Sequence, residues 1–291
     1  MKDKKFTYYP GCSAHGTSEE YEHTLNLVCK SLNIKIEEIP DWNCCGATSA
    51  HVMTENLALA LPMRNLILAE RLENSTMVIP CAACYSRMKE TKIRLDEDFS
   101  LRTKINSTVD DGDYKGNVAV KSFLQYCFED IGIEDIKEKV VKPLKDLKVA
   151  CYYGCLLTRP KNIAQFDSPE YPISMDKIIE SLGATAVEYP FKTECCGASF
   201  SISNTEIVLD LSSRILDVVK DCGADIIAVG CPLCQSNLDM RQKQIEEKMN
   251  RDYKIPVVYF TQLMALAFGY PKSELKLKKH MVNVEKVLAS F

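Results

Sequence analysis

Two adjacent cysteines followed by glycine and alanine occur twice in the chain, at residues 44–47 and 195–198. Adjacent cysteines form a poor disulfide pair, because a ring closed between neighbouring residues strains both the backbone and the bond. Two thiolates directed at one inorganic centre fit the pattern better, and the glycine permits a tight turn beside them. The repeated motif therefore predicts two sites for a metal or a metal cluster.

Further cysteines recur in step with each pair. Each half of the chain carries a single cysteine, then Cys-Cys-Gly, then Cys-x-x-Cys. The second gap is nearly equal in the halves, with 35 residues between Cys45 and Cys81 and 34 between Cys196 and Cys231. Buried free thiols alone would not recur in register, so we expect metal ligation. The predicted ligands are Cys12, Cys44, Cys45, Cys81 and Cys84 in the first half and Cys155, Cys195, Cys196, Cys231 and Cys234 in the second.

The number of cysteines per half bears on the kind of centre. A cubane iron–sulfur cluster or a zinc tetrahedron needs about four protein ligands. Five recurring thiols indicate a larger or less regular iron–sulfur cluster, or a four-ligand site with one spare thiol. Zinc held by four of the five cysteines stays an alternative at the second site. A Cys-x-x-Cys at a helix start would also direct backbone N–H groups towards an anionic cluster.

The elements expected around these cysteines alternate between strand and helix in both halves. This order predicts an α/β fold of two tandem, pseudo-symmetric domains, each a small and mostly parallel sheet flanked by helices. The boundary is placed near Pro143, which gives domains at 1–142 and 143–291. The cysteines then follow the carboxyl ends of strands, where open α/β sheets bind ligands.

Three local expectations depend on pattern alone. Residues 184–189 read as a strand, and residues 232–248 read as one long helix. Residues 96–109 have no clear assignment and are taken as a possible extension of the preceding helix.

Composition limits the class of protein. The chain has 291 residues, net charge −4 and 14 cysteines. Its pI of about 5.7 does not indicate a basic surface that binds nucleic acid. It starts without an apolar signal sequence, and no apolar run is long enough to span a bilayer. We therefore expect a cytoplasmic protein whose cysteines bind metal or do redox chemistry rather than form structural disulfides.

The cysteine pattern resembles the cysteine-rich CCG domain, present twice, and the chain is similar to the B subunits of heterodisulfide reductases from methanogenic archaea. The resemblance extends over both halves. The residues that carry it are Gly11 and Cys12, Cys44 to Gly46, Cys81 and Cys84, Gly154 and Cys155, Cys195 to Gly197, and Cys231 and Cys234.

The resemblance implies two non-cubane 4Fe–4S clusters, one per cysteine set, that reduce the mixed disulfide of coenzyme M and coenzyme B to two thiols. It also implies two partner chains of the heterodisulfide reductase, one ferredoxin-like and one that contains flavin and bifurcates electrons, with an associated hydrogenase or formate dehydrogenase. The repeat suggests the hypothesis that two facing clusters flank one disulfide. The alternatives are an electron-transfer subunit of a hydroxy-acid or quinone oxidoreductase and a zinc-stabilised scaffold.

Other residues near the motifs have weaker assignments. His15 and His51 follow predicted ligands and could supply a proton to a departing thiolate, although an ordinary loop role is the alternative. Cys151 aligns with Tyr8 and is not expected to be a ligand. Core positions are expected for Cys29, Cys127 and Cys222. The cationic side chains of Arg87, Arg159, Lys161 and Lys192 could hold the anionic groups of the implied substrate, although solvated surface positions are expected for them.

Overall fold

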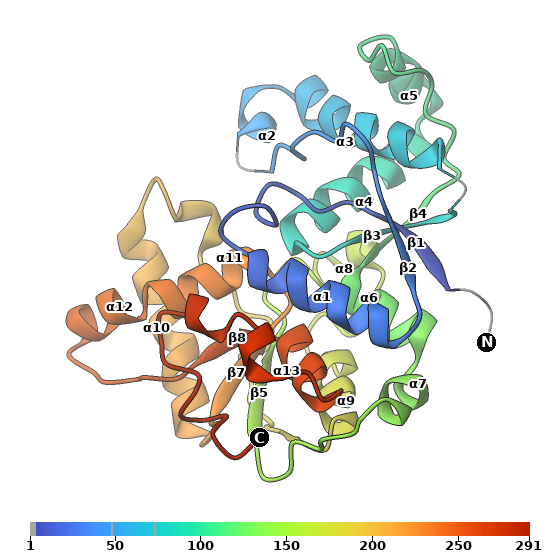
Figure 1. Ribbon diagram of the computed structural model, residues 1–291. Helices are drawn as coiled ribbons and strands as arrows, with labels where there is room; N and C mark the ends of the chain where they lie inside the picture. Colours follow the sequence, from blue (N-terminus) through green and yellow to red (C-terminus); the bar gives the residue numbers. More distant parts are fainter. Residues whose placement is uncertain (1–3, 48, 73) are drawn as a thin grey trace.

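The computed structural model describes residues 4–47, 49–72 and 74–291. It contains two four-stranded sheets with the orders β2-β1-β3-β4 and β6-β5-β7-β8, in which every strand pair is parallel. Helices flank both sheets (Figure 1). The predicted fold class of two similar α/β units is therefore confirmed.

The first half contains β1 Lys5–Tyr8, α1 Glu19–Ser31, β2 Lys35–Glu38, α2 Ala50–Met53, α3 Glu55–Glu70, β3 Thr76–Ile79, α4 Ala82–Glu97, α5 Phe99–Asn106, β4 Ala119–Ser122, α6 Phe123–Tyr126, the π-helical segment η1 Cys127–Ile131, and α7 Ile133–Glu138. The second half contains β5 Lys148–Tyr152, α8 Lys161–Ala164, α9 Ser174–Ser181, β6 Thr185–Ala186, η2 Ala198–Phe200, α10 Thr205–Asp221, β7 Ile226–Val229, α11 Pro232–Gln235, the π-helical segment η3 Ser236–Met240, α12 Gln242–Met249, β8 Val257–Tyr259, α13 Phe260–Ala267, η4 Lys272–Glu274 and η5 Leu277–Lys279.

The central strands are apolar because helices cover both faces of each sheet. All four residues of β7 are buried, as are the last three residues of β3. Continuous burial of this kind is typical of parallel strands, in contrast to the alternating pattern of half-exposed strands. These strands hold the loops at their carboxyl ends in fixed positions.

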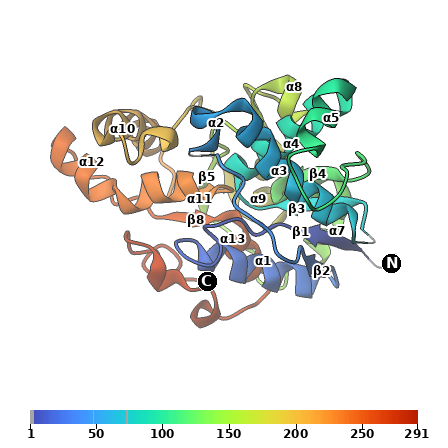
Figure 2. The same cartoon turned by 90° about the horizontal axis from the view of Figure 1, so that it is seen from above.

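The two halves share a core. Helices α1 and α13 lie side by side in both views (Figures 1 and 2). Between them the rings of Tyr21 and Tyr259 stack with centroids 4.3 Å apart, and the Thr24 and Thr261 hydroxyls lie 2.7 Å apart. One cluster of buried side chains runs through both halves. The domain boundary at residue 143 therefore stays a prediction.

Three local expectations need correction. Strand β6 covers only Thr185 and Ala186. The Val187 N–H still donates to the Val149 carbonyl at 2.8 Å, and the chain then leaves the sheet towards Pro190, which has no N–H to donate. The predicted helix 232–248 is interrupted by the π turn of η3. Residues 99–106 form a separate helix, α5, whose first turn is capped by the Asp98 carboxylate through a 2.9 Å bond from the Leu101 N–H.

Candidate metal centre

The ten predicted ligands all follow the carboxyl ends of strands. In the first half Cys12 follows β1, the Cys44–Cys45 pair follows β2 and Cys81 follows β3. The second half repeats this arrangement with β5, β6 and β7. Strand β2 is added on one side of β1 and β3 on the other, and β6 and β7 are added in the same way on either side of β5. Such switch points are the usual ligand sites of open parallel sheets.

The first cysteine set forms a chain of neighbouring thiols. The sulfur atoms of Cys45 and Cys84 are 3.2 Å apart. Cys12 interacts with Cys44, Cys44 with Cys45, and Cys81 with Cys84. All five side chains therefore belong to one cluster of sulfur atoms.

The second cysteine set is built in the same way. The sulfur atoms of Cys155 and Cys195 are 3.9 Å apart, and so are those of Cys196 and Cys234. Cys231 interacts with Cys234.

The two sets meet across the halves. Cys81 of the first set and Cys231 of the second interact through their side chains. Cys81 and Cys231 are the N-cap residues of α4 and α11, which begin after the equivalent strands β3 and β7. Equivalent positions of the pseudo-symmetric fold thus interact across the two halves.

Glycine is required beside each set. Gly11 and Gly154 have φ angles of +73° and +67°, in the left-handed region that other residues rarely adopt. A Cβ atom on Gly11 would lie 3.2 Å from the Cys84 sulfur, and one on Gly154 only 2.8 Å from the Cys234 sulfur. The backbone therefore approaches the thiols more closely than a side chain would allow.

A tyrosine fixes each Cys-Cys stretch at the same point. The Tyr9 hydroxyl donates to the Asn43 carbonyl at 2.9 Å, and the Tyr152 hydroxyl donates to the Glu194 carbonyl at 2.6 Å. Both carbonyls belong to the residue that precedes the cysteine pair. Sequence reasoning missed these tyrosines, although their matched positions in the repeat were a usable signal.

Hydrogen-bond donors surround one sulfur of each pair. The Gly46 N–H lies 3.4 Å from the Cys44 sulfur, and the Gly197 N–H lies 3.3 Å from the Cys195 sulfur. The Cys155 thiol and the N–H groups of Gly197 and Ala198 lower the pKa of Cys195 to about 6. The Cys12 and Cys45 thiols and the Gly46 N–H likewise lower the pKa of Cys44. Cys44 and Cys195 are therefore each stabilised as thiolate, the form that binds metal.

The donor set fits an iron–sulfur cluster. It consists of soft sulfur atoms supported by backbone N–H groups, which is the environment that such clusters use. Within the described ranges, no three His, Cys, Asp or Glu side chains already surround the position of a single metal ion. The thiols lie in two extended groups instead, and the assignment of the ten cysteines as ligands stays a prediction.

The structure describes the surroundings of only one of the two predicted histidines. The His15 ring stacks on Trp42 with centroids 5.9 Å apart and lies 3.7 Å from Glu22 and 3.9 Å from Glu38. His51 belongs to α2, but its side chain lies outside what the structure describes. A proton-donor role for either residue stays a prediction.

Two expectations about side-chain burial are wrong. Lys192 is buried, not solvated, because its ammonium pairs with the buried Asp176 carboxylate at 2.6 Å. Cys222 is exposed and is the C-cap residue of α10. The core assignments of Cys29 and Cys127 are confirmed, and Cys151 is buried within β5.

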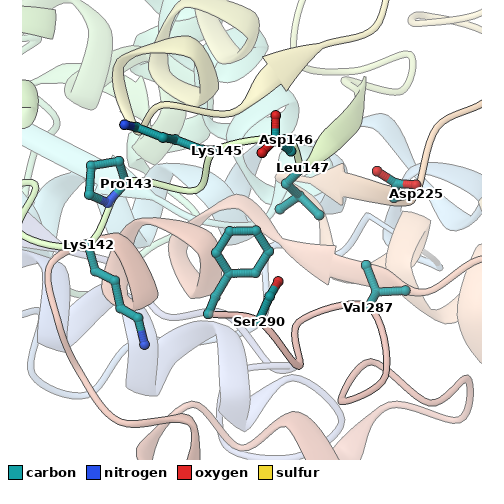
Figure 3. Close-up of a pocket in the computed structure, with 9 residues that line it drawn as sticks. Lys142, Pro143, Lys145, Asp146, Leu147, Asp225, Val287 and Ser290 are labelled. Atoms are coloured by element: carbon teal, nitrogen blue, oxygen red, sulfur yellow. The ribbon is translucent and has the colours of Figure 1, made fainter.

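A cavity of about 510 Å³ lies at the opposite edge of the second sheet (Figure 3). It is lined by Leu147 and Asp225, which directly precede β5 and β7, and by Phe291 at the end of the chain. None of the described residues that line it is a cysteine. This cavity is therefore separate from the candidate metal centre.

The cysteine-rich domain family, CCG, matches residues 6–89 and 149–239. The chain belongs to this family. Each matched segment contains one complete cysteine set, so the family and the geometry identify the same residues. The chain is thus a protein of two CCG domains, with cysteines clustered in a way that is consistent with iron–sulfur centres.

Several curated proteins are similar over nearly their whole length. The chain is 32% identical, over 98% of its length and 99% of the relative's, to the 8-methylmenaquinol:fumarate reductase membrane anchor subunit of Wolinella succinogenes. It is 29% identical, over 97% of its length and 95% of the relative's, to the B subunit of the ferredoxin/F420H2-dependent CoB-CoM heterodisulfide reductase of Methanosarcina acetivorans. These relatives are subunits of larger oxidoreductases.

A solved structure of a hypothetical protein from Helicobacter pylori has the same fold, with a TM-score of 0.76 and 14% identity. The match covers 97% of this chain and 52% of that one. Within the described part of the chain, no helix is both long and apolar enough to cross a membrane.

Proposed function

We propose that the protein is the iron–sulfur subunit of a disulfide-reducing oxidoreductase and that its substrate is the heterodisulfide of coenzyme M and coenzyme B. The overall reaction adds two electrons and two protons to one S–S bond and releases two thiols. The observation that carries the proposal is the side-chain interaction of Cys81 with Cys231, because it links the two cysteine sets across the halves. A disulfide substrate that yields one thiol from each of its two sulfur atoms suits two adjoining centres.

Two non-cubane 4Fe–4S clusters would be held by the first and second cysteine sets and would supply one-electron transfer there. The protein's own groups prepare these positions. Backbone N–H groups stabilise thiolates at Cys44 and Cys195, and the buried Cys84 and Cys234 lie against the close backbone at Gly11 and Gly154.

Exposure differs among the thiols in a way that suits a substrate that arrives from solvent. Cys12, Cys44 and Cys195 are exposed and Cys155 is half-buried, whereas the remaining six predicted ligands are buried. The buried thiols can hold a centre in place, while the exposed side of each set is open to a small molecule. His15, which is half exposed and lies near two carboxylates, is the proposed source of a proton.

The electron donors in this proposal are other chains. The sequence lacks a ferredoxin-type run of closely spaced cysteines, so cubane clusters would lie on a separate ferredoxin-like chain of the complex. A flavin-containing, electron-bifurcating chain, with a hydrogenase or formate dehydrogenase, would supply electrons to that relay. The 29% identity to the B subunit of a heterodisulfide reductase supports this assembly.

A second candidate function has its own support. The 32% identity to a subunit of 8-methylmenaquinol:fumarate reductase favours electron transfer between a quinol and a partner enzyme. In that case the two cysteine sets would pass electrons without cleaving a substrate bond.

The two functions are separated by an anaerobic assay of the protein loaded with iron and sulfide. Reduced methyl viologen supplies electrons, and oxidation of the dye is followed with the CoM–CoB heterodisulfide as acceptor. We expect heterodisulfide-dependent oxidation, its loss in Cys84→Ser, and full activity in the exposed-cysteine control Cys222→Ser. Fully loaded protein that does not reduce the disulfide, yet is reduced by a menaquinol analogue, would establish the second function instead. Protein that binds zinc without iron or sulfide would contradict both.

A further inference from the structure

A buried amide lies against the second cysteine set. Asn237 is 1% exposed and lies in η3, three residues after Cys234. Its Nδ2 group donates to the Cys196 carbonyl at 3.1 Å and reaches the Cys196 sulfur at 3.5 Å. The Ser201 hydroxyl lies 3.0 Å from Oδ1. A carbonyl can only accept, so the Cys196 carbonyl fixes the NH2 group on the side of the sulfur.

The first set lacks this contact. The equivalent position, three residues after Cys84, is Arg87, which pairs with Glu90 at 3.0 Å on the uninterrupted helix α4. Among the described residues, no side-chain N–H donates to the Cys45 sulfur, the counterpart of Cys196. Asn237 lies on the π turn of η3 and is buried there, whereas α4 has no π turn at the equivalent point.

Hydrogen bonds to a ligand sulfur withdraw electron density from it and stabilise the more negative, reduced form of a cluster. We propose that Asn237 is a positioning residue that raises the reduction potential of the second centre above that of the first, so that the second set receives the first electron from an external one-electron donor. This inference rests on the proposed function only in that both sets hold iron–sulfur clusters.

The test is a potentiometric titration followed by electron paramagnetic resonance, on the anaerobic, iron-loaded protein. Wild type should show two midpoint potentials. Asn237→Leu removes the donor, and Asn237→Asp replaces it with a charged acceptor. We expect both variants to lower the higher midpoint, more so in Asn237→Asp, and to leave the lower midpoint unchanged. The matched control is Asn250→Asp, which adds the same charge at an exposed helix end of the same half.

Unchanged midpoints in both Asn237 variants at full iron content would overturn the inference, as would a shift of equal size in Asn250→Asp. If the Asn237 variants do not bind iron and sulfide, the titration is repeated with Ser201→Ala, which removes only the hydroxyl beside Asn237 Oδ1. We expect a smaller decrease of the same midpoint potential. An unchanged midpoint potential in Ser201→Ala would then overturn the proposal. The potential can shift in a protein that fails to reduce the heterodisulfide, so the two proposals fail separately.

Discussion

The side chains of Cys81 and Cys231 interact across the two halves, and each residue is the N-cap of the helix that follows the equivalent strand of its half. These residues are 150 positions apart in the chain. Their interaction joins the two cysteine sets into one site.

Loss of a thiol in one set should affect that set only. Cys45→Ser removes a buried sulfur that lies 3.2 Å from the Cys84 sulfur. We expect about half of the iron and acid-labile sulfide to be lost and the signal of the second centre to persist, because its five cysteines are untouched. Iron analysis and paramagnetic resonance measure both effects. Full iron content with unchanged spectra would show that Cys45 is not a ligand.

Close packing of backbone against sulfur can be tested at Gly154. A Cβ atom there would lie 2.8 Å from the Cys234 sulfur, while the backbone adopts a φ of +67°. Gly223 has nearly the same φ, +68°, with nothing within 4 Å of its virtual Cβ. Both substitutions to alanine should destabilise the fold by about 1–2 kcal/mol through backbone strain.

Only Gly154→Ala should also deplete iron at the second set, since only there does the new methyl group meet a thiol. Urea unfolding gives the stability change and metal analysis gives the iron content. Equal iron content in the two variants would refute the claim that Gly154 keeps space for the sulfur.

The repeated tyrosine bond should contribute more in the second half. Tyr152→Phe leaves the Glu194 carbonyl without its donor, whereas after Tyr9→Phe the Asn43 carbonyl still accepts from the Asn65 Nδ2 group at 3.0 Å. A hydrogen bond of this kind contributes about 0.5–1.5 kcal/mol. We expect Tyr152→Phe to lower the free energy of unfolding in urea by that amount and Tyr9→Phe to lower it by less. An equal or larger loss in Tyr9→Phe would contradict this difference.

Stability should fall in mild acid because of His280. Burial lowers the pKa of this residue to about 4 from 6.5, and its ring contacts the amides of Gln235 and Gln262. Between these pH values the unfolded chain binds a proton that the folded chain does not, so stability present above pH 6.5 is lost as pH falls towards 4. The full effect is roughly 3 kcal/mol.

His280→Gln should flatten this pH dependence in urea unfolding measured from pH 7 to pH 4.5, whereas His23→Gln should keep it. Identical slopes in wild type and His280→Gln would show that another group controls acid sensitivity.

Much of the fold followed from residue patterns. The apolar runs of β3 and β7, the Pro-Gly and Gly turns after the strands and the repeat of cysteines predicted two parallel α/β units correctly. The interruption of the long helix by η3 was not predictable, because the segment from Pro232 onwards has helical periodicity and the π turn depends on tertiary contacts. One such contact is Asp239, which accepts from the Met281 and Val282 N–H groups of the distant C-terminal segment.

The site was predicted less completely than the fold. Spacing predicted ten cysteine ligands, and the repeat suggested that two sets face each other. It could not show which cysteines interact across the halves, because the interaction of Cys81 with Cys231 depends on the tertiary packing of the two halves. Lys192 was misjudged because its partner, Asp176, is 16 residues away on α9. Asn237 carries no motif, and only its position against Cys196 reveals it.

Two iron–sulfur centres should adjoin where the two halves meet. This arrangement can be tested by anomalous diffraction at the iron edge from anaerobically grown crystals. We expect two separate groups of iron atoms, one bound by the set that contains Cys81 and one by the set that contains Cys231. A single iron group, two groups bound by other residues, or zinc at either set would rule out two adjoining iron–sulfur centres.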